Sequence, residues 1–417
     1  MNVYAVKGER LVEDKKQNWI CIAIGLFLCF PSLNSAIGSI TKFFFGAQFE
    51  LGTYAIYAIY FLVMMYVLYK NIRRISISTF VITIFMLISF MLSIVLNNVA
   101  QYVWTSFDDI IGNPIYLFFL YGFWGLYLAQ YLKDMGLLCS YLDKFTLATI
   151  ILALLQYIIA LQSALSPQYM VFSYNLLFPT AYFSLRCMSN FGLKRLFGTA
   201  IGVGLILIAG CRGALVCYLI AILLYVIFSG GVLRIQKAVS ILLLLLAIAG
   251  ISTFWDEILG IAIELLESMN IDSRTLTMLS NQSFFDDSGR SAIQKTIMDN
   301  IGFLPKGLYY DRIAANGSYA HNLFLELAIQ YGILLGGLII VWLCYHVIQS
   351  VFAVSKNPTA RVVLYSLIAS GLMRLMFSGS YLLNEPGFWL LIGLMLNYCN
   401  SEYAKSSEWS GEVCFKK

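Results

Sequence analysis

The chain has 417 residues, of which 60% are hydrophobic and only 12% are charged, and its mean hydropathy is +0.79. Soluble domains are typically about 45–50% apolar and about 25% charged, so this composition excludes an ordinary soluble protein. The net charge of +5 is spread over short loops between apolar runs, which argues against a nucleic-acid partner and for orientation in a membrane.

Twelve apolar stretches predict an all-α, polytopic membrane protein that forms a single membrane domain, residues 1–417. Each stretch is near the length of about 20 residues that crosses the hydrocarbon core. In chain order they are 19–39, 52–69, 76–96, 112–132, 145–163, 169–187, 195–209, 212–229, 237–254, 321–349, 361–378 and 385–399.

Loop charges predict the orientation of these stretches. Lys and Arg occur in the N-terminal segment and in every second loop, whereas the five short loops on the other side hold only Lys42 and Arg212. By the positive-inside rule, both termini are cytoplasmic. Basic residues ahead of the first stretch also fit a cleaved signal peptide, but the unbroken charge alternation favours a retained helix.

One loop, 255–319, is much longer than the others and follows the ninth stretch on the non-cytoplasmic face. Its segment 256–268 has apolar and acidic residues at helical spacing, which predicts a helix on the membrane surface. A second helix is predicted over 290–300, after Ser288 as its N-cap. Turns are predicted at 314–318. A loop of this length in a compact protein is usually functional.

Two arginines lie at the non-cytoplasmic end of the predicted bundle. Arg212 starts the eighth stretch, where helix N–H groups and a guanidinium together suit a phosphate or pyrophosphate. A side chain that snorkels to the headgroups explains Arg212 equally well. Arg290 opens the predicted loop helix after Asp286 and Asp287, and taken alone it is better explained as part of a surface salt bridge.

Arg374 and His321 are the remaining candidates. Arg374 lies inside the eleventh stretch, where a charge is costly and usually faces the bundle interior or a wet cavity, so function is favoured over snorkelling. His321, one of two histidines, begins the tenth stretch, where it serves either as a helix cap or as a proton acceptor near neutral pH. Tyr319 and Asn322 flank it and are assigned with Arg374 to substrate binding.

Other chemistry is not predicted. Two distant histidines without an acidic triad do not make a catalytic zinc site, so no metal and no cofactor are expected. The nine cysteines have no CxxC spacing and do not suggest a disulfide framework. Two glycine clusters, 198/202/204 and 332/336/337, are predicted to be packing notches between helices.

Three short blocks carry a resemblance to a known family. They are Gly210-Cys211-Arg212-Gly213-Ala214, Ser288-Gly289-Arg290, and His321-Asn322 followed after nine residues by Gly332. In order and spacing they resemble the bacterial O-antigen ligase/polymerase superfamily, membrane glycosyltransferases that use undecaprenyl-pyrophosphate-linked glycans. Cys211 stands where that family usually has serine. The resemblance covers residues 190–400, and the preceding residues share only the topology.

The resemblance implies a GT-C-like fold and a metal-independent reaction on the periplasmic face of the bacterial inner membrane. A lipid-linked glycan is the donor and another lipid-linked repeat unit is the acceptor. Arg212 and Arg290 would bind the donor pyrophosphate, and His321 would orient or deprotonate the acceptor hydroxyl. Arg374 is added as a second pyrophosphate or glycan contact. Membrane lipid and a chain-length regulator are the other expected partners.

Within that family, a polymerase of repeat units is favoured over a ligase that transfers finished glycan to lipid A-core. The ligase form usually has Gly, Thr or Tyr at the position of Leu335, and segment 377–389 looks more like the polymerases. A transporter or flippase would carry broken helices and charges near the midplane, whereas here the charges gather at one face. A purely structural membrane partner would not need Arg374.

Overall fold

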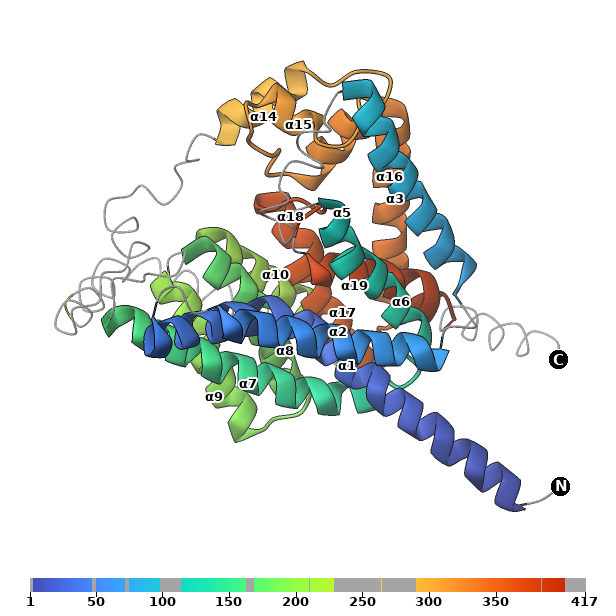
Figure 1. The fold of residues 1–417 in the computed structure, drawn as a ribbon, viewed down its shortest axis with the longest axis vertical. Coiled ribbons are helices and arrows are strands. Elements are labelled where there is room, and N and C mark those ends of the chain that lie inside the picture. The colour runs from blue at the N-terminus through green and yellow to red at the C-terminus, as the bar shows by residue number, and fades with distance from the viewer. Residues whose placement is uncertain are drawn as a thin grey trace.

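The computed structural model describes residues 3–46, 50–71, 75–97, 114–162, 169–209, 211–228, 264, 290–383 and 385–401 (Figure 1). The regular structure of these residues is entirely helical, with no strand among them, which confirms the predicted all-α class. The helices are α1 (Val3–Phe45), α2 (Leu51–Asn71), α3 (Ile77–Asn97), α5 (Pro114–Leu117), α6 (Trp124–Tyr131), α7 (Met135–Gln162), α8 (Tyr169–Ser189), α9 (Leu193–Ala209), α10 (Arg212–Phe228), α14 (Arg290–Asp299), α15 (Tyr310–Ala314), α16 (Leu323–Ala353), α17 (Pro358–Leu367), α18 (Arg374–Phe377) and α19 (Pro386–Leu394), with π-helical turns η2 (Phe118–Phe123), η4 (Ile368–Met373) and η5 (Met395–Cys399).

Eleven of the twelve predicted apolar stretches coincide with helical segments, and the stretch 237–254 lies outside the described residues. Six described helices are long and apolar enough to cross a membrane, which suits a membrane-embedded protein. The number twelve and the orientation of the termini stay predictions. The six helices cover Lys15–Phe45, Leu51–Asn71, Ile77–Leu96, Met135–Ala160, Leu323–Ala353 and Pro358–Phe377.

The helices pack in two directions (Figure 1). α1 lies against both α2 and α7, and α8 packs on α7, α9, α10 and α17. α3 and α16 stand steeply to this group and carry α14 and α15 at the upper end of the molecule. The described part of the large loop, residues 290–319, therefore sits over one end of the bundle, and α14 and α15 both contact α16.

Glycines allow α19 to lie very close to its neighbours. A Cβ on Gly125 of α6 would come 2.8 Å from the backbone nitrogen of Leu390, and a Cβ on Gly371 of η4 would come 2.5 Å from that of Phe388. Backbones approach this closely in membrane proteins where small residues form the interface. α19 is thereby packed tightly between α6 and η4. This packing fixes the position of Glu385, the residue that precedes α19.

α16 is broken at Gly332, whose φ of 75° and ψ of 168° are not helical. The backbone of the large loop fills the break: the N–H groups of Lys306 and Gly307 donate to the carbonyl of Gln330, at 3.0 and 2.8 Å. On the other side of the break, the N–H of Ile333 donates to the carbonyl of Gly302 at 3.0 Å. The helix groups freed by the break are thus bonded to the loop, as the low dielectric of a membrane requires.

This geometry corrects two sequence predictions. The stretch 321–349 is not one uninterrupted helix, because it divides at Gly332. Gly332 itself is not a notch between helices: a Cβ there would lie 2.6 Å from the carbonyl carbon of Leu304, in the loop. Gly198 and Gly202 do behave as predicted, because they face Phe183 and Thr180 of α8, whereas a Cβ on Gly204 or Gly337 would meet no atom within 4 Å.

The large loop is partly as predicted. α14 begins at Arg290, which confirms the helix predicted over 290–300, and the turn at 314–318 contains Asn316 and Gly317 with φ of 50° and 93°. The short helix α15 was not predicted. The amphipathic helix expected over 256–268 lies outside the described residues apart from position 264.

Candidate active site

Arg290 joins the large loop to the end of the helical bundle. Its Nη1 donates to the backbone carbonyl of Phe377, the last residue of α18, at 3.0 Å. α17, η4 and α18 form one continuous helical run, and a cation at the carboxyl end of such a run is favoured by the helix dipole. The predicted site residue is thus anchored at one end of its side chain, with its charge at the upper end of the bundle.

His321 lies where the loop turns into α16. Its φ of 53° is left-handed, and its ring centroid is 4.0 Å from that of Tyr319. Its Nδ1 is buried and has no hydrogen-bond partner. Burial, and secondarily the charge of Arg290, lower the pKa of His321 to about 4. The imidazole is therefore neutral at neutral pH and has a nitrogen that can accept a proton.

Asn322 is the N-cap of α16. Its Oδ1 accepts hydrogen bonds from the backbone N–H groups of Phe324 and Leu325, at 3.0 and 3.2 Å. An asparagine N-cap typically stabilises a helix by about 1 kcal/mol. The cap fixes the direction in which α16 leaves His321. Because Oδ1 is used by the cap, the predicted contact with substrate would be made by the amide nitrogen of Asn322.

Arg212 is the first residue of α10, and the next residue, Gly213, packs closely against two neighbouring side chains. A Cβ at Gly213 would collide with the hydroxyl of Tyr174, and it would lie 3.6 Å from the Cβ of Phe377. Phe377 is also the residue whose carbonyl holds Arg290. The structure therefore brings the Arg212 turn and Arg290 to the same end of α18.

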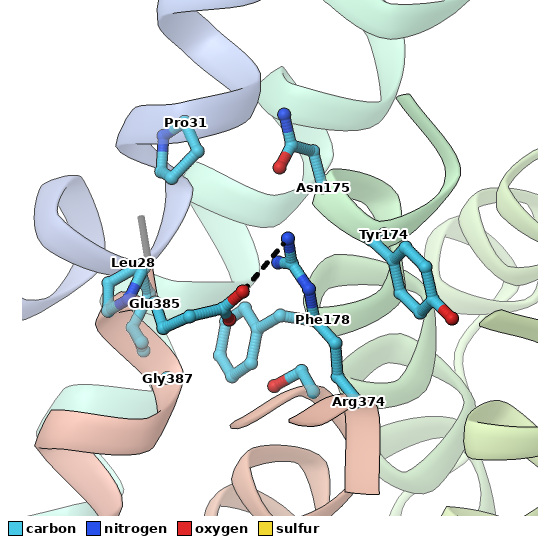
Figure 2. A pocket seen from close by; sticks show the side chains of 10 residues that line it. Leu28, Pro31, Tyr174, Asn175, Phe178, Arg374, Glu385 and Gly387 are labelled. Carbon is cyan, nitrogen blue, oxygen red and sulfur yellow. Dashed lines mark ion pairs between the residues drawn. The ribbon is translucent and has the colours of Figure 1, made fainter. Parts of the chain in front are cut away.

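Arg374 lines a different pocket from the region around His321 and Arg290. Figure 2 shows its guanidinium beside Glu385, Asn175 and Tyr174, in a pocket formed mainly by α1, α8 and α19. Its Nη2 is 3.1 Å from Oε1 of Glu385, and their side chains are only 16% and 2% exposed. Neither His321 nor Arg290 lines this pocket. The predicted second donor arginine thus has a buried carboxylate as its counter-ion.

Tyr174 connects the Arg374 pocket to the Arg212 turn. Its ring lies 5.0 Å from the guanidinium carbon of Arg374, and its hydroxyl abuts Gly213. The hydroxyl is buried without a hydrogen-bond partner. No local pattern distinguishes Tyr174 from the other tyrosines among the 27 in the chain, because only the packing of α8 against α10 brings it to the site.

A buried polar network joins α15, α16 and the segment that follows α18. Gln330 donates from Nε2 to Oδ1 of Asp311 at 3.1 Å and to Oε1 of Glu326 at 3.4 Å, and it accepts from the hydroxyl of Tyr381 at 2.7 Å. Ser380 donates to Glu326. All five side chains are at most 3% exposed. Such a network specifies one arrangement when every group is paired.

The network is tied to the histidine through the backbone. Oδ2 of Asp311 accepts from the N–H of Ala320, the residue before His321, at 3.3 Å. Burial is the main cause that raises the pKa of Asp311 above its ordinary value. Glu326 and Gln330, four residues apart in an apolar run, were a visible sequence signal, because such a pair lies on one helix face.

Replacing Asp311 by alanine is expected to destabilise the protein and loosen the backbone at His321. The change leaves one of the two N–H groups on Nε2 of Gln330, and the N–H of Ala320, without an acceptor, and each such loss typically costs about 1–3 kcal/mol. The measurement is the thermal unfolding midpoint of the purified protein in detergent. Asp299→Ala, the same change at an exposed position of α14, is the control and should leave the midpoint unchanged. Equal midpoints for the two variants would contradict this assignment.

Among the described residues, no group of three or more His, Cys, Asp or Glu side chains is arranged to hold a metal ion. No disulfide joins two of the described cysteines. Comparison with protein-family models, with curated proteins and with solved structures finds no match to the chain.

Proposed function

We propose that the chain is a bacterial O-antigen polymerase, a metal-independent membrane glycosyltransferase. It would join undecaprenyl-pyrophosphate-linked repeat units at the periplasmic face of the inner membrane. The observation that carries the proposal is the proximity of a neutral, half-buried His321 to Arg290, which binds the carboxyl end of α18. The family resemblance of the blocks around Arg212, Arg290 and His321 supports it.

The proposed reaction assigns one task to each group. The acceptor sugar hydroxyl attacks the anomeric carbon of the donor glycan, and its proton passes to His321. The bond from that carbon to the pyrophosphate oxygen breaks, and undecaprenyl pyrophosphate leaves with its charge stabilised by Arg290 and by Arg212 at the start of α10. Direct attack inverts the anomeric configuration.

Arg374 takes a smaller part in this proposal than the sequence suggested. Because Glu385 balances its charge, Arg374 serves better to hold α18 against α8 and α19 than to attract a pyrophosphate. As a glycan contact, Arg374 would require this pocket to open, because its Nε is buried without a partner. The pocket beside it has about 20 Å³ of space, which is about the size of one water molecule.

Two alternatives share features with this structure. A ligase that transfers glycan to lipid A-core would use the same groups and differ in its acceptor. A transporter or flippase is favoured by one observation, the break of α16 at Gly332 beside buried Glu326 and Gln330. Against transport, the loop backbone fills that break, and the buried side chains are bonded to one another.

Gene deletion separates the three functions. Surface lipopolysaccharide from deleted and complemented cells would be resolved on a gel. Loss of a polymerase leaves core plus a single repeat unit, and the wild-type gene restores a ladder. Loss of a ligase leaves bare core while lipid-linked polymer accumulates. Loss of a flippase leaves bare core without periplasmic polymer, and this last pattern would overturn the proposal.

Activity is expected to persist well below the ordinary pKa of histidine. The base form of His321 is the neutral imidazole, and its pKa of about 4 keeps it neutral as the pH falls through 6.5. The acidic limb of the rate of polymer formation in membrane vesicles should therefore lie near pH 4. A limb centred near pH 6.5 would show that the imidazole is solvated and not desolvated beside Arg290.

A further inference from the structure

A second cavity lies at the turn between α8 and α9, and α9 is at the opposite end of the molecule from α14 and α15 (Figure 1). Its volume is about 380 Å³, against about 20 Å³ for the pocket beside Arg374. The proposed reaction uses none of its residues. The cavity is lined by Asp143, Leu147, Phe183, Gly192, Leu193, Lys194 and Arg195.

Positive charge is in excess around this cavity. Asp143 pairs with Arg195, whose Nη2 is 2.6 Å from Oδ2, and more distantly with Arg186, whose Nε is 3.7 Å from Oδ1. Nη1 of Arg195 also donates to the carbonyl of Asn190 at 2.8 Å, which holds the guanidinium in place. Lys194 is exposed at the rim. One carboxylate thus stands against three cations.

Apolar surface adjoins this charge. Leu147, Phe183 and Leu193 form part of the cavity wall, and just outside it Phe191 and Phe197 are 69% and 65% exposed. The first turn of α9 lines the cavity, so the positive end of the helix dipole adds to the same field. A fixed cationic pocket beside exposed aromatic rings fits an amphiphile with a negative head and not a free ion.

We infer that the cavity binds the phosphate headgroup of an anionic phospholipid, with the acyl chains lying along Phe191 and Phe197. The headgroup phosphate contacts Lys194 and Arg195. The charge pattern of the loops predicts that this turn is cytoplasmic, on the membrane face where juxtamembrane basic residues attract anionic lipids. The inference does not rest on the proposed glycosyltransferase function.

The test uses the full chain purified in detergent and mixed with phosphatidylglycerol or with phosphatidylcholine, followed by native mass spectrometry of retained lipid. The wild type should retain phosphatidylglycerol in preference to phosphatidylcholine. Lys194→Gln should weaken that retention about fivefold, since one basic residue near the surface contributes about 1 kcal/mol. The matched control is Lys144→Gln, an exposed lysine of α7 that lies over Tyr141 and does not line the cavity.

Three results would overturn the inference. The first is equal retention of the two lipids by the wild type. The second is an equal loss of phosphatidylglycerol in Lys194→Gln and Lys144→Gln, which would indicate a diffuse surface charge. The third is full displacement of phosphatidylglycerol by inorganic phosphate at equal concentration, which would mean that the cavity binds the free anion.

Arg195→Lys, which keeps the charge but loses the double contact to Asp143 and Asn190, should retain part of the binding.

Discussion

Replacing His321 by alanine is expected to abolish polymer formation while the protein still accumulates in the membrane. The change removes the group that accepts the proton of the acceptor hydroxyl, and such general-base groups typically contribute 10²–10⁴-fold to a rate. Folding should be little affected, because the Nδ1 of His321 makes no hydrogen bond and the cap of α16 belongs to Asn322. The measurement is the lipopolysaccharide ladder of complemented cells, with protein level checked by blot.

The chain provides a matched control for this variant. His346, the other histidine, lies against Trp342 with ring centroids 4.9 Å apart, in the same helix α16 but far from the large loop. His346→Ala should leave the ladder intact. A normal ladder from His321→Ala would remove the histidine from the mechanism, and the arginines would then be tested as a binding site that works without it.

Replacing Gly332 by alanine is expected to destabilise the protein strongly. A φ of 75° places an alanine in a left-handed conformation, and its Cβ would lie 2.6 Å from the carbonyl carbon of Leu304. Strained backbone alone costs about 1–3 kcal/mol, and the clash is with backbone that cannot rotate away. The loop has to leave the break in α16, which exposes the carbonyl of Gln330 inside the bundle. We expect a lower thermal unfolding midpoint and faster proteolysis of the loop.

Gly337, five residues further along α16, is the control. A Cβ there meets no atom within 4 Å, and its backbone is helical. Alanine is preferred to glycine inside a helix by about 1 kcal/mol, so Gly337→Ala should keep or raise the unfolding midpoint. If both variants behaved alike, the break at Gly332 would not be a fixed feature of the fold.

The sequence predicted the helices well because their signal is local. Long apolar runs and loop charges act within about 20 residues, so the helical segments and the start of α14 at Arg290 could be read directly. The break in α16 could not be, because Gly332 differs from Gly336 and Gly337 only through the loop segment that inserts at its side.

Only part of the candidate site could be predicted, because some of its residues are brought together by tertiary contacts and not by local sequence. Arg290 and His321 stand out by residue type and position, and they do lie close enough for the arginine to lower the pKa of the histidine. The counter-ion of Arg374 was missed, although Glu385 is the first residue of the last apolar stretch. Asp311 and Tyr174 belong to the site only through contacts across 9 and 39 positions of sequence, to Ala320 and Gly213, which no local pattern encodes.

The filled break in α16 has a consequence for exchanging parts of this protein. Residues 302–307 supply both the donors and the acceptor that complete the helix around Gly332, so the loop is not a detachable module. A chimera that grafts a foreign loop onto this bundle would leave α16 with open backbone groups unless the helix portion travels with it. The smallest unit that can be transferred therefore runs from α14 through Ile333. Any specificity that the loop carries would be transferred together with His321, which lies just before α16.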